Sequence, residues 1–272
     1  MNTVTPINLH SAQNSSISSA TAHFDEHFKL VVANTPKLQA EVYKLRYKVY
    51  CQELGYEREE DCPNGMEQDI YDQHSIHCLL LHRKSGVYAG CVRLVLPKPN
   101  HSGTNLPFER VFGQGLQSSL KELKHLSYDA VGEVSRLAVT AEFRKRIGET
   151  ETTHGVATEQ YEAKENERRY FPLIALGLYL AATGVAMELG LDSALTLMEP
   201  RLARHLRRFG IRFRQVGELV EFHGQRGLFQ ISQDAALDDM DADTYELLQR
   251  LRSQIKQSLR HYPVKLSDCQ AA

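Results

Sequence analysis

Apolar and polar positions alternate along the chain in a pattern that predicts a sheet of short strands. Apolar runs bounded by Gly, Asn, Ser or Pro are typical of strands, since these residues favour turns. We expect strands at residues 28–32, 77–82, 88–96, 131–139, 193–198, 211–216, 219–223 and 228–231.

Helices are predicted between these strands. Leu38, Val42, Leu45 and Val49 recur at helical spacing and predict an amphipathic helix from Pro36 to near Gly55. The segment 171–187 carries no charge but is shorter than the ~20 residues that usually cross a bilayer, which favours a helix buried against a sheet. Further helices are expected at 200–209 and around the apolar face that Leu248, Leu251, Ile255 and Leu259 form.

The order of these elements predicts an α/β (α+β) fold with a mixed, mostly antiparallel sheet and helices on both faces. Residues 1–25, rich in Ser, Thr, Asn and Ala, are expected to form a disordered tail. Residues 26–232 would form the main domain, interrupted by a charged insert at 140–170. Residues 233–272 would form a linker and a C-terminal amphipathic helix.

Composition and charge place the chain among soluble globular proteins. It has 272 residues, of which 42% are hydrophobic and 24% charged, and a net charge of −2, which implies no nucleic-acid or membrane partner overall. Its five cysteines are dispersed without a CxxC pair, and no zinc-ligand spacing is present, so we expect free thiols, no bound metal and a reducing, cytoplasmic location. The N-terminus lacks the pattern of a secretory signal.

Charged side chains interrupt several of the apolar segments. They are Arg46 on the first helix, Asp69 and Asp72 in the loop after it, Arg93 in the third strand, and Glu133 and Arg136 in the fourth. Near an interior such groups must pair, because an unpaired ion costs several kcal/mol. On composition alone a structural ion-pair network is favoured over a catalytic cluster.

Four stretches in this order also resemble a known family: Leu45–Tyr50 with Glu53–Tyr56, Asp69 with Asp72, Gly90–Leu94, and Glu133–Arg136. Over residues 28–232 the chain resembles the superfamily of autoinducer synthases and long-chain N-acyl amino acid synthases, within it the acyltransferases associated with PEP-CTERM/exosortase gene clusters. The resemblance implies the GCN5-related N-acetyltransferase (GNAT) fold. It also implies transfer of a long fatty acyl group from an acyl carrier protein or coenzyme A thioester to a small amine such as an amino acid, with no tightly bound cofactor.

The same resemblance implies roles for particular residues. Its charged cluster would line the active cleft, with Glu133 as the first candidate for the base that deprotonates the amine, and Arg136 holding Glu133 or Asp72. The acyl-phosphopantetheine arm would pair with the fourth strand, which makes Val134, Leu137 and Val139 candidates for binding it. Tyr56 stands where autoinducer synthases usually have Trp, which favours N-acyl amino acid synthesis over lactone synthesis.

Two features concern the acyl donor. The pyrophosphate loop expected before the helix of coenzyme A-dependent relatives is reduced to a remnant at 145–148, which favours an acyl carrier protein donor. The helix at 200–209 is rich in arginine, and we interpret it either as a solvated face or as a docking surface in which Arg204, Arg207 and Arg208 contact the acidic carrier protein.

Alternatives remain for function and for the last helix. A non-catalytic module of the same fold that senses acyl carrier protein or lipid would lack turnover, and an autoinducer synthase would release a lactone. RNA binding is disfavoured because no aromatic residues are interleaved with the arginines. The C-terminal helix would pack on the domain or, less favoured, contact the inner membrane face peripherally.

Overall fold

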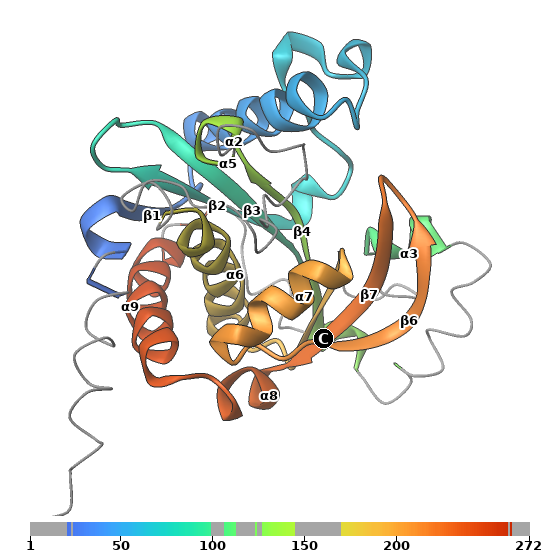
Figure 1. Cartoon of the computed structure of the whole chain (residues 1–272). Helices are drawn as coiled ribbons and strands as arrows, with labels where there is room; N and C mark the ends of the chain where they lie inside the picture. Colours follow the sequence, from blue (N-terminus) through green and yellow to red (C-terminus); the bar gives the residue numbers. More distant parts are fainter. Residues whose placement is uncertain are drawn as a thin grey trace, which may run out of the picture.

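A single mixed sheet forms the centre of the protein (Figure 1). The computed structural model describes residues 21–22, 24–98, 106–112, 123, 127–144, 170–260 and 262. Seven strands follow the order β1-β2-β3-β4-β5-β7-β6, and all neighbours are antiparallel except β4 and β5. Their bounds are β1 Phe28–Val32, β2 Ser75–His82, β3 Tyr88–Val95, β4 Val131–Val139, β5 Ser193–Met198, β6 Arg214–Glu221 and β7 Gln225–Ser232.

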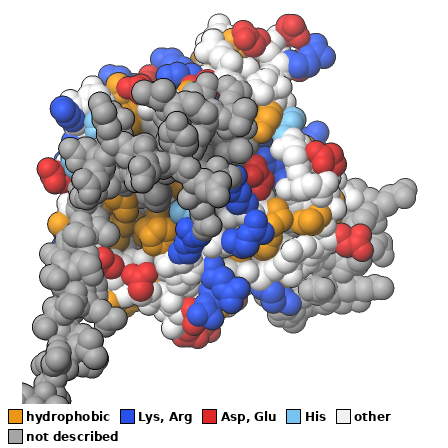
Figure 2. All heavy atoms as spheres, in the orientation of Figure 1, with side chains coloured by type: hydrophobic (Ala, Val, Ile, Leu, Met, Phe, Trp, Pro, Cys, Tyr) orange, Lys and Arg blue, Asp and Glu red, His pale blue; other side chains and the backbone are white. Residues whose placement is uncertain are grey.

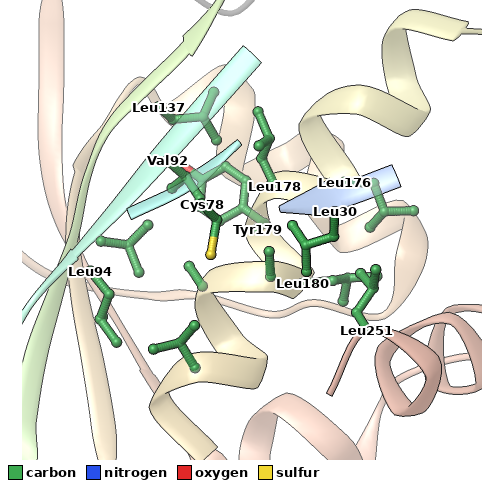
Figure 3. Close-up of a cluster of buried hydrophobic side chains, with 14 of the residues drawn as sticks. Leu30, Cys78, Val92, Leu94, Leu137, Leu176, Leu178, Tyr179, Leu180 and Leu251 are labelled. Atoms are coloured by element: carbon green, nitrogen blue, oxygen red, sulfur yellow. The ribbon is translucent and has the colours of Figure 1, made fainter. Parts of the chain in front are cut away.

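One face of the sheet is covered by the apolar helix α6, Tyr170–Glu188, with α9, Ala242–Leu259, packed against it (Figure 1). Leu178 and Leu180 of α6 meet Cys78 and Val92 of the sheet in the main core, and Leu251 of α9 closes it (Figure 3). None of the described helices is long and apolar enough to cross a membrane.

Two glycines explain how closely α6 packs. A Cβ at Gly177 would run into the Phe24 ring, and one at Gly184 would lie 2.9 Å from Ile255 of α9. A side chain at either position would force its neighbour to shift. The predicted packing of the last helix on the domain is therefore what the structure has.

The opposite face is covered by α2, Pro36–Tyr47, which continues as a π-helical segment, Lys48–Glu53. Thr35 caps α2, because its side chain accepts a hydrogen bond from the Leu38 amide. Val42 and Val49 pack on Leu79 and Cys91, whose neighbours Cys78 and Val92 face α6. Alternation along β2 and β3 thus places helices on both faces, and the predicted fold class is confirmed.

The sheet opens between β4 and β5. These parallel strands pair only from Val131 with Ser193 to Val134 with Thr196, while β4 continues to Val139. Beyond Val134 the two strands are no longer paired. The end of this pairing leaves part of the β4 backbone without a strand partner on that side, next to the candidate site described below.

Several local predictions differ from the structure. The three expected closing strands are two, because the register irregularity between Gln215 and Leu219 joins the first two runs into β6. The expected linker contains a short helix, α8, Gln233–Asp238, capped by Ser232. Phe24 is buried in the main core, so order begins before residue 26, and the rest of the predicted tail, residues 1–20 and 23, lies outside the described residues.

The predicted charged insert falls mostly outside the described residues. Its first part forms α5, Ala141–Arg144, and residues 145–169, which include the remnant of the pyrophosphate loop, are not described. Arg144 is anchored by an ion pair to Glu53 at 3.0 Å, which ties the end of β4 to the π-helical segment.

Candidate active site

A cavity of about 630 Å³ lies where β4 and β5 diverge. One wall is β4 from Glu133 to Leu137, and the floor reaches Thr196 of β5 and Tyr179 of α6. The remaining lining comes from segments 56–71 and 107–111 and from the turn between β6 and β7. The cavity exists because the parallel ladder ends at Val134, which leaves space that no neighbouring strand fills.

Behind the cavity lies a network of buried ion pairs. Arg46 donates to Glu67 at 2.5 Å and to Asp72 at 2.6 Å, and Arg93 donates to Asp69 at 2.6 Å and to Asp72 at 2.7 Å. Both guanidinium groups are fully buried. Each carboxylate is therefore shared or paired, which offsets the desolvation of the charges.

Arg136 joins this network from an unusual backbone conformation. Its φ of +50° lies in the left-handed region, which non-glycine residues rarely adopt. The ladder pairs Cys91 with Ala138 but Arg93 with Ser135, so β4 carries one extra residue there, a β-bulge. The bulge turns the Arg136 guanidinium towards the loop, where it pairs with Glu57 and Glu67 at 3.1 Å and with Asp69 at 3.5 Å.

The arginines keep the network ionised. Burial alone would raise the pKa of Glu67, but Arg46 and Arg136 lower that pKa to about 2. Burial opposes ionisation of Asp72 too, and Arg46 and Arg93 hold its pKa well below the usual range. Carboxylates with such low pKa values are poor proton acceptors at neutral pH, so we assign them to positioning rather than to proton transfer.

Glu133 differs from every carboxylate of the network. Its side chain is buried, and it accepts a 2.8 Å hydrogen bond from the Phe108 amide. Among the described residues it forms no ion pair within 4.0 Å, and burial raises its pKa to about 8. A carboxylate that titrates near the working pH, on the wall of a cavity, has the properties of a general base.

The structure brings most of the sequence-predicted residues together. Asp69, Glu133 and Arg136 line the cavity, and Arg46, Asp72 and Arg93 lie behind it. Arg136 holds Glu57, Glu67 and Asp69 and not Glu133 or Asp72, because the bulge directs it to the loop.

The predicted thioester-binding residues divide into three groups. Val134 and Leu137 line the cavity. Val139 does not line it but lies in the main core, because β4 pairs with β3 to its end and carries Val139 away from the opening. Arg204, Arg207 and Arg208 are exposed on α7, Pro200–Leu206, and the turn that follows it.

Sequence reasoning missed Glu67, which pairs with both Arg46 and Arg136. It precedes Asp69 and Asp72 on the same loop. The three predicted acids already balanced the three predicted arginines, so the charge count did not point to Glu67. The aromatic wall of the cavity gave no signal either, since it joins segments far apart in the chain.

That aromatic wall consists of Tyr50, Tyr56 and His223. The rings of Tyr56 and His223 stack with centroids 4.4 Å apart and planes 13° apart, and Tyr50 lies 6.5 Å beyond Tyr56. The Tyr50 hydroxyl donates to the Leu137 carbonyl at 2.9 Å, which fixes the stack to β4. The turn between β6 and β7 is thereby held against the loop that carries Tyr56.

Comparison with known proteins supports the architecture. Residues 45–152 match the family model described as acetyltransferase (GNAT) domain. Together with the sheet described above, this match supports the GNAT fold. No curated protein matches the chain by sequence.

Solved structures share this GNAT fold at low sequence identity. The AHL synthase LasI has a TM-score of 0.52 and 15% identity, over 79% of this chain and 98% of that one. TofI, in a ternary complex with an inhibitor and MTA, has a TM-score of 0.50 and 20% identity over 81% and 96%. The CoA-dependent acyl-homoserine lactone synthase BjaI, with SAM and isopentyl-CoA, has a TM-score of 0.50 and 16% identity over 86% and 98%.

Proposed function

We propose that the protein is an N-acyltransferase that moves a long fatty acyl group from a thioester to the amine of a small acceptor such as an amino acid. The observation that carries this proposal is Glu133, a buried carboxyl with a pKa near 8 on the wall of the cavity between β4 and β5. The GNAT domain and the acyl-lactone synthases of similar fold support an acyl thioester as the donor.

The chemistry assigned to Glu133 is the removal of one proton. An amine is protonated at neutral pH and must lose a proton before its lone pair can attack the thioester carbonyl. Glu133, directly or through a water, accepts that proton while the new C–N bond forms, and the thiolate then leaves as the C–S bond breaks. Backbone amides along the diverging part of β4 are candidates to stabilise the oxyanion.

A covalent enzyme intermediate is not part of the proposal. Cys62 is the described cysteine that lines the cavity, and burial raises the pKa of its thiol while its sulfur contacts that of Cys51 at 3.5 Å. A thiol held protonated in this way is a weak nucleophile. Direct attack by the amine therefore accounts better for the arrangement.

The aromatic wall favours an amino acid over an adenosyl co-substrate. BjaI was solved with SAM. The adenine of SAM is a flat aromatic ring that can stack on aromatic side chains. Here one face of Tyr56 is covered by His223 at 4.4 Å and the other faces Tyr50 at 6.5 Å, so neither gap admits a further ring without moving the stack. Paired rings have centroids about 4.5–7 Å apart, so a ring inserted between Tyr56 and Tyr50 would need these two to stand about 9 Å apart.

We assign the donor to acyl carrier protein through the exposed arginines of α7. Lys and Arg side chains gather over α7 in Figure 2, and Arg204, Arg207 and Arg208 are among its exposed residues. The residue before α7, Glu199, pairs with the cavity residue Arg226 at 3.7 Å, which places the start of this basic helix beside the cavity. An acidic carrier protein docked there would deliver its acyl arm over a short path.

The direct test is turnover with defined donors and acceptors. Purified protein is given long-chain acyl carrier protein or acyl-CoA thioesters with a mixture of amino acids, and separately with SAM, and the products are identified by mass spectrometry. We expect N-acyl amino acids, and we expect lipid extracts of overproducing cells to contain them only when Glu133 is intact. Homoserine lactone as the product would support the synthase alternative, and binding of acyl carrier protein without turnover would support a sensing module.

The same proposal includes a cytoplasmic location, a peripheral membrane contact through α9 and the association with exosortase gene clusters. Lys256 on α9 and Arg260 just after it are exposed, while the apolar face of α9 is packed on α6. Such a helix offers charge but little apolar surface to a bilayer. Sedimentation with anionic vesicles, compared with neutral ones, measures whether this charge is enough.

A further inference from the structure

Cys51 and Cys62 lie side by side next to the cavity. Their sulfur atoms are 3.5 Å apart, and both side chains are buried. Cys51 belongs to the π-helical segment, and Cys62 follows a single 3-10 turn, Glu59–Asp61. A disulfide has an S–S length of about 2.05 Å, so a relative shift of about 1.5 Å would join them.

The residues between the two cysteines carry one side of the cavity mouth. Tyr56 stacks on His223, and Glu57 pairs with Arg136 at 3.1 Å. Gly55 reverses the chain with a φ of +62° just before them. A covalent bond between Cys51 and Cys62 would close this segment into a ring and fix where Tyr56 and Glu57 stand.

Access differs between the two thiols. Cys62 lines the cavity, so a small oxidant that enters the cavity meets it, whereas Cys51 is absent from the lining and lies behind it. The remaining described cysteines offer no comparable pair. Cys78 faces the α6 side of the sheet and Cys91 the α2 side, so their sulfurs point apart.

We propose that Cys51 and Cys62 form a reversible disulfide when a peroxide enters the cavity, and that this bond lowers the activity of the adjacent site. The Cys62 thiolate attacks a peroxide oxygen and becomes a sulfenic acid as hydroxide leaves. The Cys51 sulfur then attacks Cys62, the S–S bond forms, and the second hydroxide leaves and takes the proton. Two thiols and one hydrogen peroxide thus give one disulfide and two waters.

The effect on activity follows from the ring. A displacement of about 1 Å in a positioning element can cost 10²-fold in rate. Glu57 and Tyr56 both belong to the displaced segment and contact Arg136 and His223 on the facing wall. Burial raises the pKa of both thiols, that of Cys51 to about 12, so oxidation should be slow at neutral pH and faster as pH rises.

The test starts with peptide mapping of the reduced full-length chain after treatment with hydrogen peroxide. Trypsin cleaves after Arg58, between the two cysteines, so a disulfide would hold two tryptic peptides together until dithiothreitol is added. We expect this linked pair with a mass loss of about 2 Da. It should persist in Cys78→Ala, which shares the second peptide, and disappear in Cys51→Ser and Cys62→Ser.

Activity is then measured on the same samples. We expect at least a 10-fold loss of kcat/KM in the oxidised chain, recovery with dithiothreitol, and resistance to peroxide in Cys51→Ser, whose circular dichroism confirms folding. No linked pair, or a linked pair with undiminished turnover, would overturn the proposal. The part of the proposal that concerns lowered activity rests on the proposed function. A chain that forms the linked pair but never shows acyl transfer would refute that function and leave the disulfide established.

Discussion

The Phe108 amide donates a 2.8 Å hydrogen bond to Oε2 of Glu133, inside the cavity at the opening of the sheet. This bond favours the ionised carboxylate, but burial is the larger effect and leaves the pKa near 8. The bond also fixes the direction of the carboxyl group. Glu133 is thus both oriented and able to exchange a proton near neutral pH.

Replacing Glu133 with Gln should lower kcat by about 10²–10⁴-fold, because the amide keeps the shape of the side chain but cannot accept the proton. In the wild type, kcat/KM should rise with pH up to about 8 as Glu133 ionises, and the variant should lose that dependence. Steady-state kinetics between pH 6 and 9 would measure both. Glu221→Gln, which changes another cavity-lining carboxylate, is the control, and an equal loss there would contradict the assignment.

The same variant tests the raised pKa through stability. The folded protein holds the Glu133 proton up to about pH 8, whereas an unfolded Glu releases it near pH 4.5. The free energy of unfolding of the wild type should therefore fall, relative to that of Glu133→Gln, as pH rises from 4.5 to 8. Urea unfolding of both proteins at pH 5, 7 and 9 measures the difference. A difference that stays constant with pH would show that Glu133 is not perturbed.

Arg46→Ala should destabilise the protein by about 3–5 kcal/mol, because it removes one of the two arginines that pair with Glu67 and one of the two that pair with Asp72 in the interior. Arg58→Ala is the matched control, since Arg58 forms its ion pairs with Glu60 and Asp61 at the exposed surface. Surface pairs contribute little. The urea denaturation midpoints of the two variants, each compared with that of the wild type, measure the loss of stability. Similar shifts in the two variants would show that the network is not needed for stability.

Arg136→Ala should lower both stability and rate. Its guanidinium is one of two that pair with Glu67 and with Asp69, and it pairs with Glu57 on the cavity wall. Its loss therefore removes positive charge from the network and frees the loop that carries Glu57. We expect a lower unfolding midpoint together with a reduced kcat. Measurement of both on the same preparation is essential, since a fall in rate without any loss of stability would assign Arg136 to the substrate instead.

Reversing charge at Arg204, Arg207 and Arg208 should raise KM for acyl carrier protein thioesters and leave a short pantetheine thioester unaffected. The expected cause is lost electrostatic steering, so the wild-type advantage should shrink as salt is added. A triple reversal at Lys29, Lys256 and Arg260, all exposed elsewhere, controls for net charge. Unchanged kinetics of the α7 variant at low salt would place the docking surface elsewhere.

Hydrophobic periodicity predicted most of the fold, because strand and helix spacing is local. The strands 28–32, 131–139 and 193–198 and the buried helix all correspond to the structure. The sequence predicted the ends of helices and strands less accurately. The continuation of α2 as a π-helical segment and the joining of two runs into β6 depend on packing and register, which no local pattern encodes.

The sequence by itself determined that buried arginines and acids must balance, because an unpaired charge in an interior is too costly. Only the tertiary structure decided which acid meets which arginine. Glu67 was missed and Arg136 was assigned to the wrong partners, because a bulge in β4 redirects its side chain. The raised pKa of Glu133 and the stack of Tyr56 on His223 likewise arise where distant segments meet, because burial and ring contacts there depend on the tertiary structure.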